Sequence, residues 1–237
     1  MHMVNRFYKT LIYNAFSGMC VLCGNASFRQ IDLCRDCEAD LPWLESHCAR
    51  CALPLASHEK YSECGRCISK PPAFSQCLSA LRYDFPVDRL IAGFKHRGKL
   101  SYGSVLAQLW LNTVGGDIDT VPDLLVPVPI HWRRRWQRGF NQATVLANHW
   151  SKALDIPICH ALTHPRATPP QQALNAAMRQ KNIKQAFAFI PQSPIRGKHV
   201  AVIDDVVTTT ATANTVAAIL ARNGARQIDI WCLARTP

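Results

Sequence analysis

Eight cysteines arranged in four pairs have the clearest chemistry in this sequence. Each pair has the spacing Cys-x-x-Cys, and ten, ten and twelve residues separate successive pairs. Two thiolates three positions apart can hold one metal ion in a tight turn, and a second pair completes the tetrahedral sulfur shell that Zn²⁺ prefers. The pairs are Cys20 and Cys23, Cys34 and Cys37, Cys48 and Cys51, and Cys64 and Cys67.

Four such pairs predict two structural zinc sites. Consecutive pairing is the simplest arrangement, with the first two pairs on one ion and the last two on the other; an interleaved arrangement is the alternative. A disulfide scaffold would need an oxidising compartment, and the N-terminus shows neither an unbroken apolar segment nor a small-residue cleavage site. We therefore expect zinc and a cytoplasmic location. The remaining cysteines, Cys77, Cys159 and Cys232, are expected to be small buried hydrophobes.

A second chemical segment runs from Val200 to Thr212 and reads VAVIDDVVTTTAT. A continuous apolar run, typical of a strand buried on both faces, ends in Asp204 and Asp205. Threonines and then a helix follow, so backbone N–H groups and hydroxyls gather at a helix N-terminus, where an anion is favoured. Carboxylates beside such a cradle suit a ligand that carries phosphate together with vicinal hydroxyls or Mg²⁺. The alternative is an acidic strand end followed by an ordinary helix cap.

Three basic segments accompany these acids. The turn at residues 94–99 offers candidates for pyrophosphate, and residues 131–142, HWRRRWQRGFNQ, place arginines among aromatic rings. Arginine pairs two phosphate oxygens at once, and aromatic rings stack on nucleobases. Residues 166–187 could form a hood that excludes water from the site. The alternatives are a solvated surface for the first segment, a solvated loop with buried tryptophans for the second, and a polar loop followed by a helix over residues 175–187 for the third. The candidate residues for pyrophosphate or nucleic acid are Lys95, Arg97, Arg133, Arg134, Arg135, Arg138, Asn141 and Arg166.

Alternating strands and helices must position these residues. The patterns predict strands over residues 78–83, 124–129, 200–203 and 227–233, and helices over residues 86–94, 100–113, 142–154, 175–187 and 213–222. This alternation predicts a parallel sheet flanked by helices. Because such sheets bind ligands at the carboxyl ends of their strands, the two acids lie where a site is expected.

The first 19 residues show helical periodicity, with apolar residues repeating at three and four positions from Val4 to Phe16. This amphipathic helix could dock on a partner or on the surface of the inner membrane. The simpler interpretation is a helix packed on its own chain. No stretch approaches the ~20 apolar residues that span a bilayer.

The charge of the chain is unevenly distributed. The 237 residues include 27 Lys and Arg against 16 Asp and Glu, a net charge of +11, and the 48% of hydrophobic residues excludes a disordered or fibrous protein. Residues 1–77 hold eight basic and seven acidic residues, whereas residues 78–237 hold 19 basic and nine acidic ones. The excess therefore belongs to the α/β part, which predicts a polyphosphate ligand first and a nucleic-acid backbone second.

The segment VIDDVVTTTAT resembles the 5-phosphoribosyl-1-pyrophosphate (PRPP) motif of type I phosphoribosyltransferases. The resemblance implies that Asp204 and Asp205 are the catalytic-site acids and contact the ribose hydroxyls. It also implies that the following residues wrap the 5-phosphate: Val206, Val207, Thr208, Thr209, Thr210, Ala211 and Thr212. The family usually has glycine at the place of Thr210. Glycine permits a positive φ that threonine resists, so weaker PRPP binding or lost turnover is expected.

The order of the motifs along the chain is similar to that of the ComF/GntX family. This family couples a zinc-ribbon N-terminus to a phosphoribosyltransferase-like domain, and its members are associated with natural competence, the uptake of single-stranded DNA. The resemblance implies an α/β, type I phosphoribosyltransferase-like parallel sheet flanked by helices and preceded by a small Cys-rich domain. The implied divisions are an N-terminal helix over 1–19, a double zinc ribbon over 20–72 and a phosphoribosyltransferase-like domain over 73–237.

Three functions fit these observations. The first is a phosphoribosyltransferase that binds Mg–PRPP, transfers the phosphoribosyl group to an amine or base, and serves DNA uptake and the processing of incoming single-stranded DNA. The second is a non-catalytic adaptor that binds single-stranded DNA and keeps the PRPP site as a sensor or phosphate site. The third is an interaction module that acts through the ribbons on proteins of the DNA-uptake machinery. We favour a PRPP-binding protein and leave its turnover open.

Overall fold

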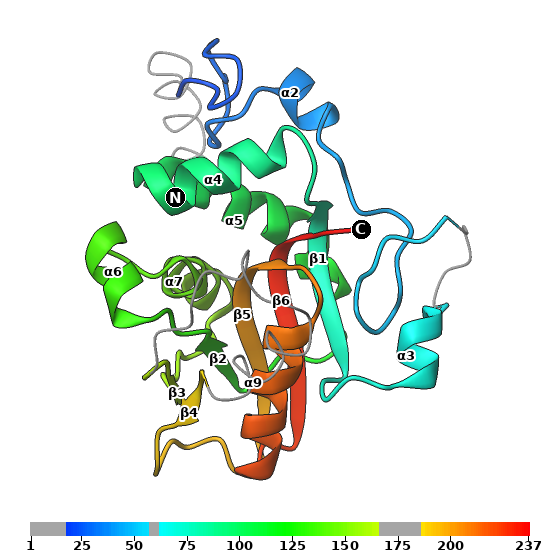
Figure 1. The fold of residues 1–237 in the computed structure, drawn as a ribbon. Coiled ribbons are helices and arrows are strands. Elements are labelled where there is room, and N and C mark those ends of the chain that lie inside the picture. The colour runs from blue at the N-terminus through cyan, green and yellow to red at the C-terminus, as the bar shows by residue number, and fades with distance from the viewer. Residues whose placement is uncertain (1–17, 57–61, 166–185) are drawn as a thin grey trace, which may run out of the picture.

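A sheet of four parallel strands lies at the centre of the molecule (Figure 1). The structure is a computed structural model that describes residues 18–56, 62–165 and 186–237. Its strands follow the order β1-β6-β5-β2, and each neighbouring pair is parallel, as the sequence predicted. Their bounds are Gln76–Arg82 for β1, Leu124–Pro127 for β2, His199–Val207 for β5 and Gln227–Arg235 for β6.

The central strand β5 is apolar on both faces. Ala201 and Ile203 belong to the apolar cluster on one face of the sheet, and Val200 and Val202 belong to the cluster on the other. All four side chains are fully buried. This pattern is typical of a parallel strand that is covered on both sides. β5 continues four residues beyond the predicted strand, so Asp204 and Asp205 lie within it and not after it.

Helices cover both faces. The first face carries α4, α5 and α7, and the second carries α9, which follows β5. Their bounds are Val87–Arg97 for α4, Leu100–Val114 for α5, Gln142–Leu154 for α7 and Ala211–Arg222 for α9. The first face also holds three indole rings in mutual contact, and Trp110 is tilted against Trp150 and Trp231 with centroids 4.3 Å and 4.9 Å away.

Four predicted helices are confirmed: the helix over residues 142–154 has the predicted ends, and those over residues 86–94, 100–113 and 213–222 have shifted ends. α4 continues to Arg97, so Lys95 and Arg97 lie in its last turn, and our expectation of a basic turn after the helix was wrong. The extension ends at Gly98, whose positive φ of 62° permits the helix to stop there. A short helix that the sequence did not predict, α6 (Trp132–Arg138), contains the arginine cluster.

Smaller elements complete the described chain. A 3₁₀ turn, η1 (Gly115–Asp117), ends α5, and the two-residue strands β3 (Leu162–Thr163) and β4 (Ala188–Phe189) form an antiparallel pair. Among the described helices, none is long and apolar enough to cross a membrane. The amphipathic helix expected over residues 1–19 and the helix expected over residues 175–187 fall almost wholly outside the described residues.

We call residues 20–72 the Cys-rich segment, and the described part of this segment forms backbone hydrogen bonds with the edge strand β1. It contains two short helices, α2 (Arg35–Ala39) and α3 (Gly65–Ser69), and the chain between them runs beside β1. The Leu44 N–H donates to the Ala80 carbonyl (3.0 Å), and the Arg82 N–H donates to the Pro42 carbonyl (2.8 Å). These bonds cover backbone groups at an edge of the sheet that would otherwise be open to pairing with other chains.

Each half of the Cys-rich segment joins a different apolar cluster. Ile31, Leu33 and Leu41 pack in the cluster that contains α4 and α5, whereas Leu44 packs in the cluster that contains α9. The unpaired cysteines follow the expectation in part. Cys77 and Cys232 are buried on neighbouring strands, and Cys159 is half-buried.

Candidate functional site

The eight paired cysteines form two clusters, and the predicted consecutive pairing is confirmed. Within each cluster the Sγ atoms lie within 4.8 Å of one another. A tetrahedral zinc site with Zn–S bonds of about 2.3 Å places neighbouring sulfurs roughly 3.8 Å apart. The Sγ atoms are 3.8 Å apart for Cys23 and Cys34 and 3.7 Å apart for Cys51 and Cys64. Both clusters therefore have the dimensions of structural zinc sites.

The two clusters differ in their surroundings. We call Cys20, Cys23, Cys34 and Cys37 the first cluster, and Cys48, Cys51, Cys64 and Cys67 the second cluster. Cys23 is exposed in the first cluster, whereas every cysteine of the second cluster is buried. In the second cluster the Cys64 N–H donates to Cys48 Sγ (3.2 Å), a contact that favours a thiolate over a thiol.

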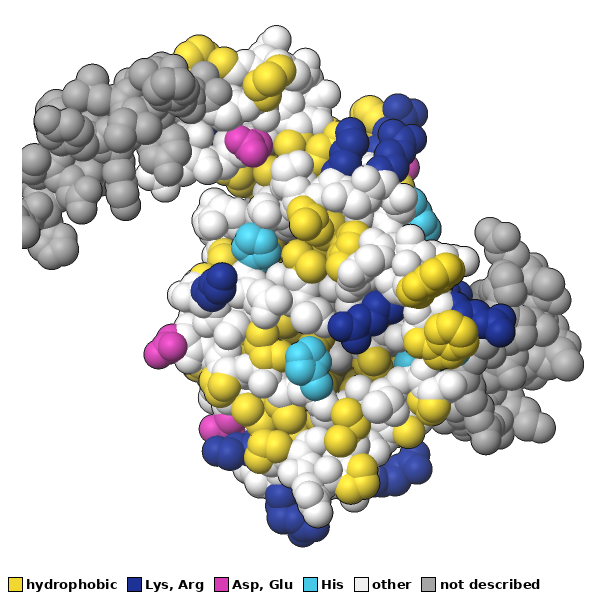
Figure 2. Space-filling model, turned by 90° about the vertical axis from the view of Figure 1, so that its left-hand side faces the viewer, with side chains coloured by type: hydrophobic (Ala, Val, Ile, Leu, Met, Phe, Trp, Pro, Cys, Tyr) yellow, Lys and Arg dark blue, Asp and Glu magenta, His cyan; other side chains and the backbone are white. Residues whose placement is uncertain are grey.

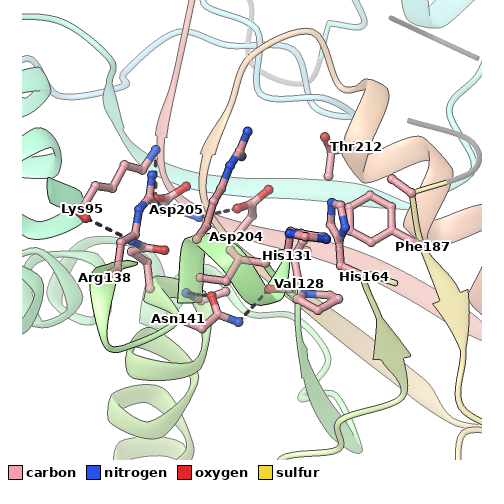
Figure 3. A pocket seen from close by; sticks show the side chains of 16 residues that line it. Lys95, Val128, His131, Arg138, Asn141, His164, Phe187, Asp204, Asp205 and Thr212 are labelled. Carbon is pink, nitrogen blue, oxygen red and sulfur yellow. Dashed lines mark hydrogen bonds and ion pairs between the residues drawn. The ribbon is translucent and has the colours of Figure 1, made fainter. Parts of the chain in front are cut away.

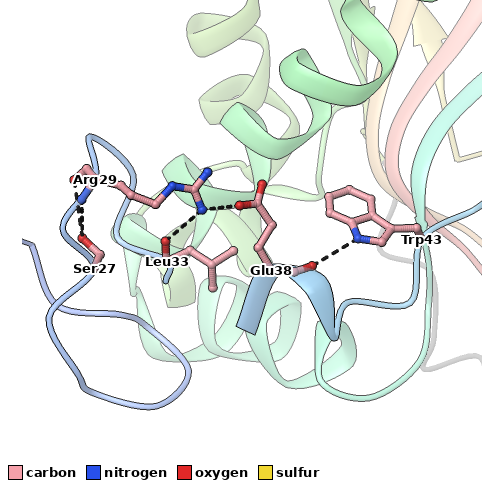
Figure 4. A network of polar contacts seen from close by, with 5 residues as sticks. All are labelled: Ser27, Arg29, Leu33, Glu38 and Trp43. Atoms are coloured by element: carbon pink, nitrogen blue, oxygen red, sulfur yellow. Dashed lines mark hydrogen bonds and ion pairs between the residues drawn. The ribbon is translucent and has the colours of Figure 1, made fainter. Parts of the chain in front are cut away.

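A polar network made of nearby residues supports the first cluster (Figure 4). Arg29 forms an ion pair with Glu38 and donates from Nη1 to the Leu33 carbonyl (3.3 Å). The indole Nε1 of Trp43 donates to the Glu38 carbonyl (3.1 Å). All of these residues belong to the Cys-rich segment, so the network connects parts of that segment to one another.

A cleft of about 200 Å³ opens at the carboxyl ends of β2 and β5 (Figure 3). Asp204 and Asp205 lie at its centre and come from β5. The ammonium Nζ of Lys95 is 2.9 Å from Asp205 Oδ2. Figure 3 shows Lys95 and Arg138 together on one side of the acids. The cleft therefore combines two carboxylates with a basic side formed by Lys95 and Arg138, which we call the basic wall.

Asp204 is poised to lose a proton near neutral pH. Loss of hydration and repulsion by the Asp205 carboxylate raise the pKa of Asp204 to about 7, against the opposing effect of Lys95. Burial also lowers the pKa of Arg138, and Asp205 offsets part of that effect. Carboxylates that are crowded in this way bind a cation or a hydroxyl hydrogen readily, because either one relieves their repulsion.

The turn between β5 and α9 consists of Thr208, Thr209 and Thr210, and we call it the phosphate loop after the PRPP motif that this segment resembles. Thr210 has a φ of 60°, the left-handed conformation that favours glycine. Two contacts hold its side chain. Its hydroxyl donates to the Thr209 carbonyl (2.6 Å) and accepts from Asn214 Nδ2 (3.2 Å). The threonine therefore keeps the backbone conformation expected of the glycine in the related motif.

The structure brings part of the predicted set into one cleft. The predicted residues that line it are Lys95, Arg134, Arg138, Asn141, Asp204, Asp205 and Thr212. Arg97, Arg133 and Arg135 are exposed and do not line the cleft, and Arg166 lies outside the described residues. Val206 and Val207 belong to β5, and Thr208 to Ala211 form the loop and the start of α9 beside the cleft.

The side chain of Asn141 is fixed by hydrogen bonds to backbone groups that lie before and after it in the chain. Its side chain caps α7 by accepting from the Ala143 N–H (3.1 Å) and donates to the Val128 carbonyl (2.9 Å). These contacts join the loop after β2 to the N-terminus of α7. We infer that Asn141 shapes the floor of the cleft through the backbone.

Sequence reasoning missed an aromatic side of the cleft. His131, His164 and Phe187 stand opposite the basic wall in Figure 3. The ring centroids are 5.6 Å apart for His131 and His164 and 4.9 Å apart for His164 and Phe187. His131 also caps α6 by accepting from the Arg133 N–H. No local pattern marks these rings, because the pairing of β3 with β4 brings His164 and Phe187 together.

Comparison with known proteins places the chain in a family. Residues 11–68 match the model of the double zinc ribbon domain. The chain is 36% identical to DNA utilization protein YhgH of Escherichia coli K12 over 225 residues, which cover 92% of this chain and 97% of the relative. It is 30% identical to competence protein F of Haemophilus influenzae, with 94% and 99% covered. The chain belongs to the ComF/GntX family.

A more distant relative in the ComF/GntX family is competence protein ComFC of Bacillus subtilis, at 25% identity, with 86% of this chain and 84% of the relative covered. Solved structures that match include a purine phosphoribosyltransferase from Pyrococcus horikoshii, with 19% identity, a TM-score of 0.37, and 57% and 75% of the two chains covered. A second is an adenine phosphoribosyltransferase from Thermoanaerobacter pseudethanolicus, with 11% identity, a TM-score of 0.37, and 59% and 83% covered.

Proposed function

We propose that this protein binds Mg–PRPP in the cleft and acts in the uptake and processing of single-stranded DNA. The observation that carries the proposal is the pair Asp204 and Asp205 near the carboxyl end of β5, two residues before the phosphate loop that leads into the N-terminus of α9. The names of the relatives support the biological setting, since they refer to DNA utilization and competence. Because both clusters need reduced thiolates, we place the protein in the cytoplasm.

Each part of the cleft has a role in this proposal. The phosphate loop and the N-terminus of α9 hold the 5-phosphate through backbone N–H groups. Asp204 and Asp205 accept hydrogen bonds from the ribose hydroxyls, and Lys95, Arg134 and Arg138 face the pyrophosphate. Mg²⁺ neutralises charge on the pyrophosphate oxygens when it is bound with PRPP. Lys95 gives up its ion pair with Asp205 as the ligand enters, which frees that carboxylate for a ribose hydroxyl.

The transfer would occur at the anomeric carbon. The bond from this carbon to pyrophosphate breaks, the electron pair leaves with pyrophosphate, and a bond to the acceptor nitrogen forms as that nitrogen loses a proton. The basic wall stabilises the leaving group. The rings of His131, His164 and Phe187 offer a stacking surface to a planar acceptor, which favours a base over an aliphatic amine.

Calorimetric titration with Mg–PRPP tests the proposal. The wild-type protein is expected to bind, and Asp204→Asn is expected to weaken binding by at least tenfold, because the amide loses the charged acceptor for ribose hydroxyls. Release of pyrophosphate in the presence of bases or amines then measures turnover. An absence of Mg–PRPP binding by the folded, zinc-loaded wild-type protein would refute the proposal.

A second candidate function, an adaptor for single-stranded DNA, is favoured by α6. Trp132 and Trp136 are 61% and 85% exposed, and three arginines lie between them in the sequence. Figure 2 shows the face that carries α6, where Lys and Arg side chains stand next to hydrophobic ones. Exposed indoles stack on bases, and arginines pair with phosphates.

The two functions can be separated by the arginines of α6. Arg133 and Arg135 do not line the cleft, whereas Arg134 does. The double variant Arg133→Ala, Arg135→Ala is therefore expected to weaken binding of single-stranded DNA while Mg–PRPP binding persists. Fluorescence anisotropy at several salt concentrations measures this effect, and the adaptor function also predicts a steep salt dependence. DNA binding that ignores both salt and these substitutions would exclude it.

The third function, an interaction module for proteins of the uptake machinery, makes an opposite prediction. A variant with Asp204→Ala and Asp205→Ala would keep transformation efficiency in cells if only the ribbons act. Under the PRPP proposal the same variant loses that efficiency although it folds and keeps its zinc.

A further inference from the structure

One buried arginine connects the second cluster to the phosphate loop. Arg235, the last residue of β6, is 1% exposed. Its Nε donates to the carbonyl of Cys51, a member of the second cluster, at 3.0 Å. Its Nη1 donates to the carbonyl of Val207 at 3.1 Å and to the carbonyl of Thr208. We propose that Arg235 is a positioning residue through which zinc in the second cluster sets the affinity of the phosphate loop. The inference rests on the proposed PRPP function.

The geometry of the peptide bond explains how Arg235 prepares the loop. In a planar trans peptide the N–H points away from the carbonyl. By holding the carbonyls of Val207 and Thr208, the guanidinium therefore turns the N–H groups of Thr208 and Thr209 away from itself. No described residue accepts a hydrogen bond from these two N–H groups. Successive N–H groups that are fixed in this way form an anion-binding concavity.

The charge of Arg235 gives the second cluster a further role. A buried guanidinium is expensive to hold without an opposite charge. Among the described residues, no carboxylate forms a salt bridge with Arg235. Four thiolates around one Zn²⁺ carry a net negative charge, and the Cys51 carbonyl that binds Arg235 belongs to one of these ligands. The zinc-loaded cluster thus supplies both the carbonyl and the counter-charge.

A second contact ties the loop to the same part of the chain. Asn214 donates from Nδ2 to the Thr210 hydroxyl (3.2 Å) and accepts at Oδ1 from the Ala73 N–H (2.9 Å). Ala73 follows α3, the helix that contains Cys67. Both ends of the loop are therefore held from the side of the second cluster. The described contacts of Arg29 at the first cluster remain within the Cys-rich segment.

Substitution by lysine tests the positioning role, with Arg29→Lys as the matched control. Lysine keeps the charge but loses the planar fork that reaches four carbonyls, those of Cys51, Val207, Thr208 and Thr236. In Arg235→Lys we expect faster hydrogen exchange at residues 207–212 and a roughly tenfold loss of affinity for ribose 5-phosphate. Arg29→Lys removes a similar arginine beside the first cluster and is expected to change neither quantity. Equal behaviour of the two variants would overturn the proposal.

The wild-type protein provides a test that does not depend on the folding of a variant. After replacement of zinc by ¹¹³Cd, the two clusters give separate resonances, which Cys23→Ser assigns by removing that of the first cluster. Because coupling between sites is reciprocal, saturation with ribose 5-phosphate should shift the resonance of the second cluster and leave that of the first unchanged. In Arg235→Lys this shift should be lost.

The outcomes separate this inference from the proposed function. If the wild-type protein binds neither ribose 5-phosphate nor Mg–PRPP, the proposed function fails, and hydrogen exchange still shows whether Arg235 orders the loop. If ribose 5-phosphate binds the wild type but the second-cluster resonance does not move, the coupling is wrong and the proposed function stands.

Discussion

The first and second clusters have the same four ligands, and the spacings within them differ by only two residues, yet they serve different parts of the molecule. The first is partly exposed, and its supporting network, built on Arg29 and Glu38, stays within its own segment. The second is buried, and Arg235 connects it to the loop beside the cleft. A sequence motif for zinc therefore defines the local geometry, whereas the residues packed around it decide what that geometry supports.

Loss of one ligand from each cluster gives the largest expected contrast. Cys64→Ser should lose one zinc equivalent, lower the free energy of unfolding by several kcal/mol and abolish measurable ribose 5-phosphate binding, because the second cluster is part of the core. Cys23→Ser should also lose one zinc equivalent but keep most of its ligand affinity. Metal content, thermal melting and calorimetry measure these changes. A larger loss of affinity in Cys23→Ser would reverse the comparison.

Asp204→Asn changes the cleft and is expected to leave both zinc clusters intact. The raised pKa of Asp204 means that the folded state binds its proton more tightly than the unfolded state does, so ionisation destabilises the fold as pH rises toward about 7. The variant should therefore be more stable than the wild type at pH 8, by on the order of 4 kcal/mol. This gain should shrink as pH falls toward 4.

Thermal melting across this pH range measures the difference, and zinc content is the control. Asp204→Asn should retain both zinc ions while it loses affinity for Mg–PRPP. A stability gain that is constant with pH would contradict the raised pKa.

Thr210→Gly tests the loop end that Asn214 holds. Glycine relieves a left-handed strain of roughly 1 kcal/mol, but it removes a hydroxyl that binds Asn214 and increases the freedom of the unfolded chain. We therefore expect a change in the free energy of unfolding within about 1 kcal/mol. Asn214→Ala is the companion variant, since it cuts the contact and keeps the strain. Denaturant unfolding should show Asn214→Ala to be the less stable of the two.

The smallest effect is expected at the first cluster. Arg29→Lys weakens a partly exposed ion pair, and such pairs contribute about 0.2–1 kcal/mol. The loss should decrease at high salt, because screening weakens exposed pairs. Melting at low and high salt measures it. A loss of several kcal/mol would show that the first cluster also supports the sheet.

Local patterns were enough to predict the two clusters, the parallel sheet and the acids at its carboxyl end. Cysteine spacing is short-range, and a strand buried on both faces has a continuous apolar run, as at Val200 to Ile203. The helix α6 was missed because its four arginines and two tryptophans have no apolar face that is buried.

Contacts between distant residues could not be predicted. Arg235 lies 184 residues from Cys51, and Asn214 lies 141 residues from Ala73. Nothing in the type or spacing of these residues indicates a partner, because folding alone brings them together. The pairing of β3 with β4 likewise places His164 beside Phe187.

The chain beside β1 has a consequence for attempts to divide the protein. A fragment that starts at residue 73 would lose Pro42 and Leu44, whose backbone groups bond to Arg82 and Ala80. It would also lose the Cys51 carbonyl and leave the Arg235 guanidinium short of an acceptor. Such a fragment would present a bare strand edge to its copies, and exposed edges promote aggregation. Work on the isolated α/β part therefore requires the Cys-rich segment to be expressed with it.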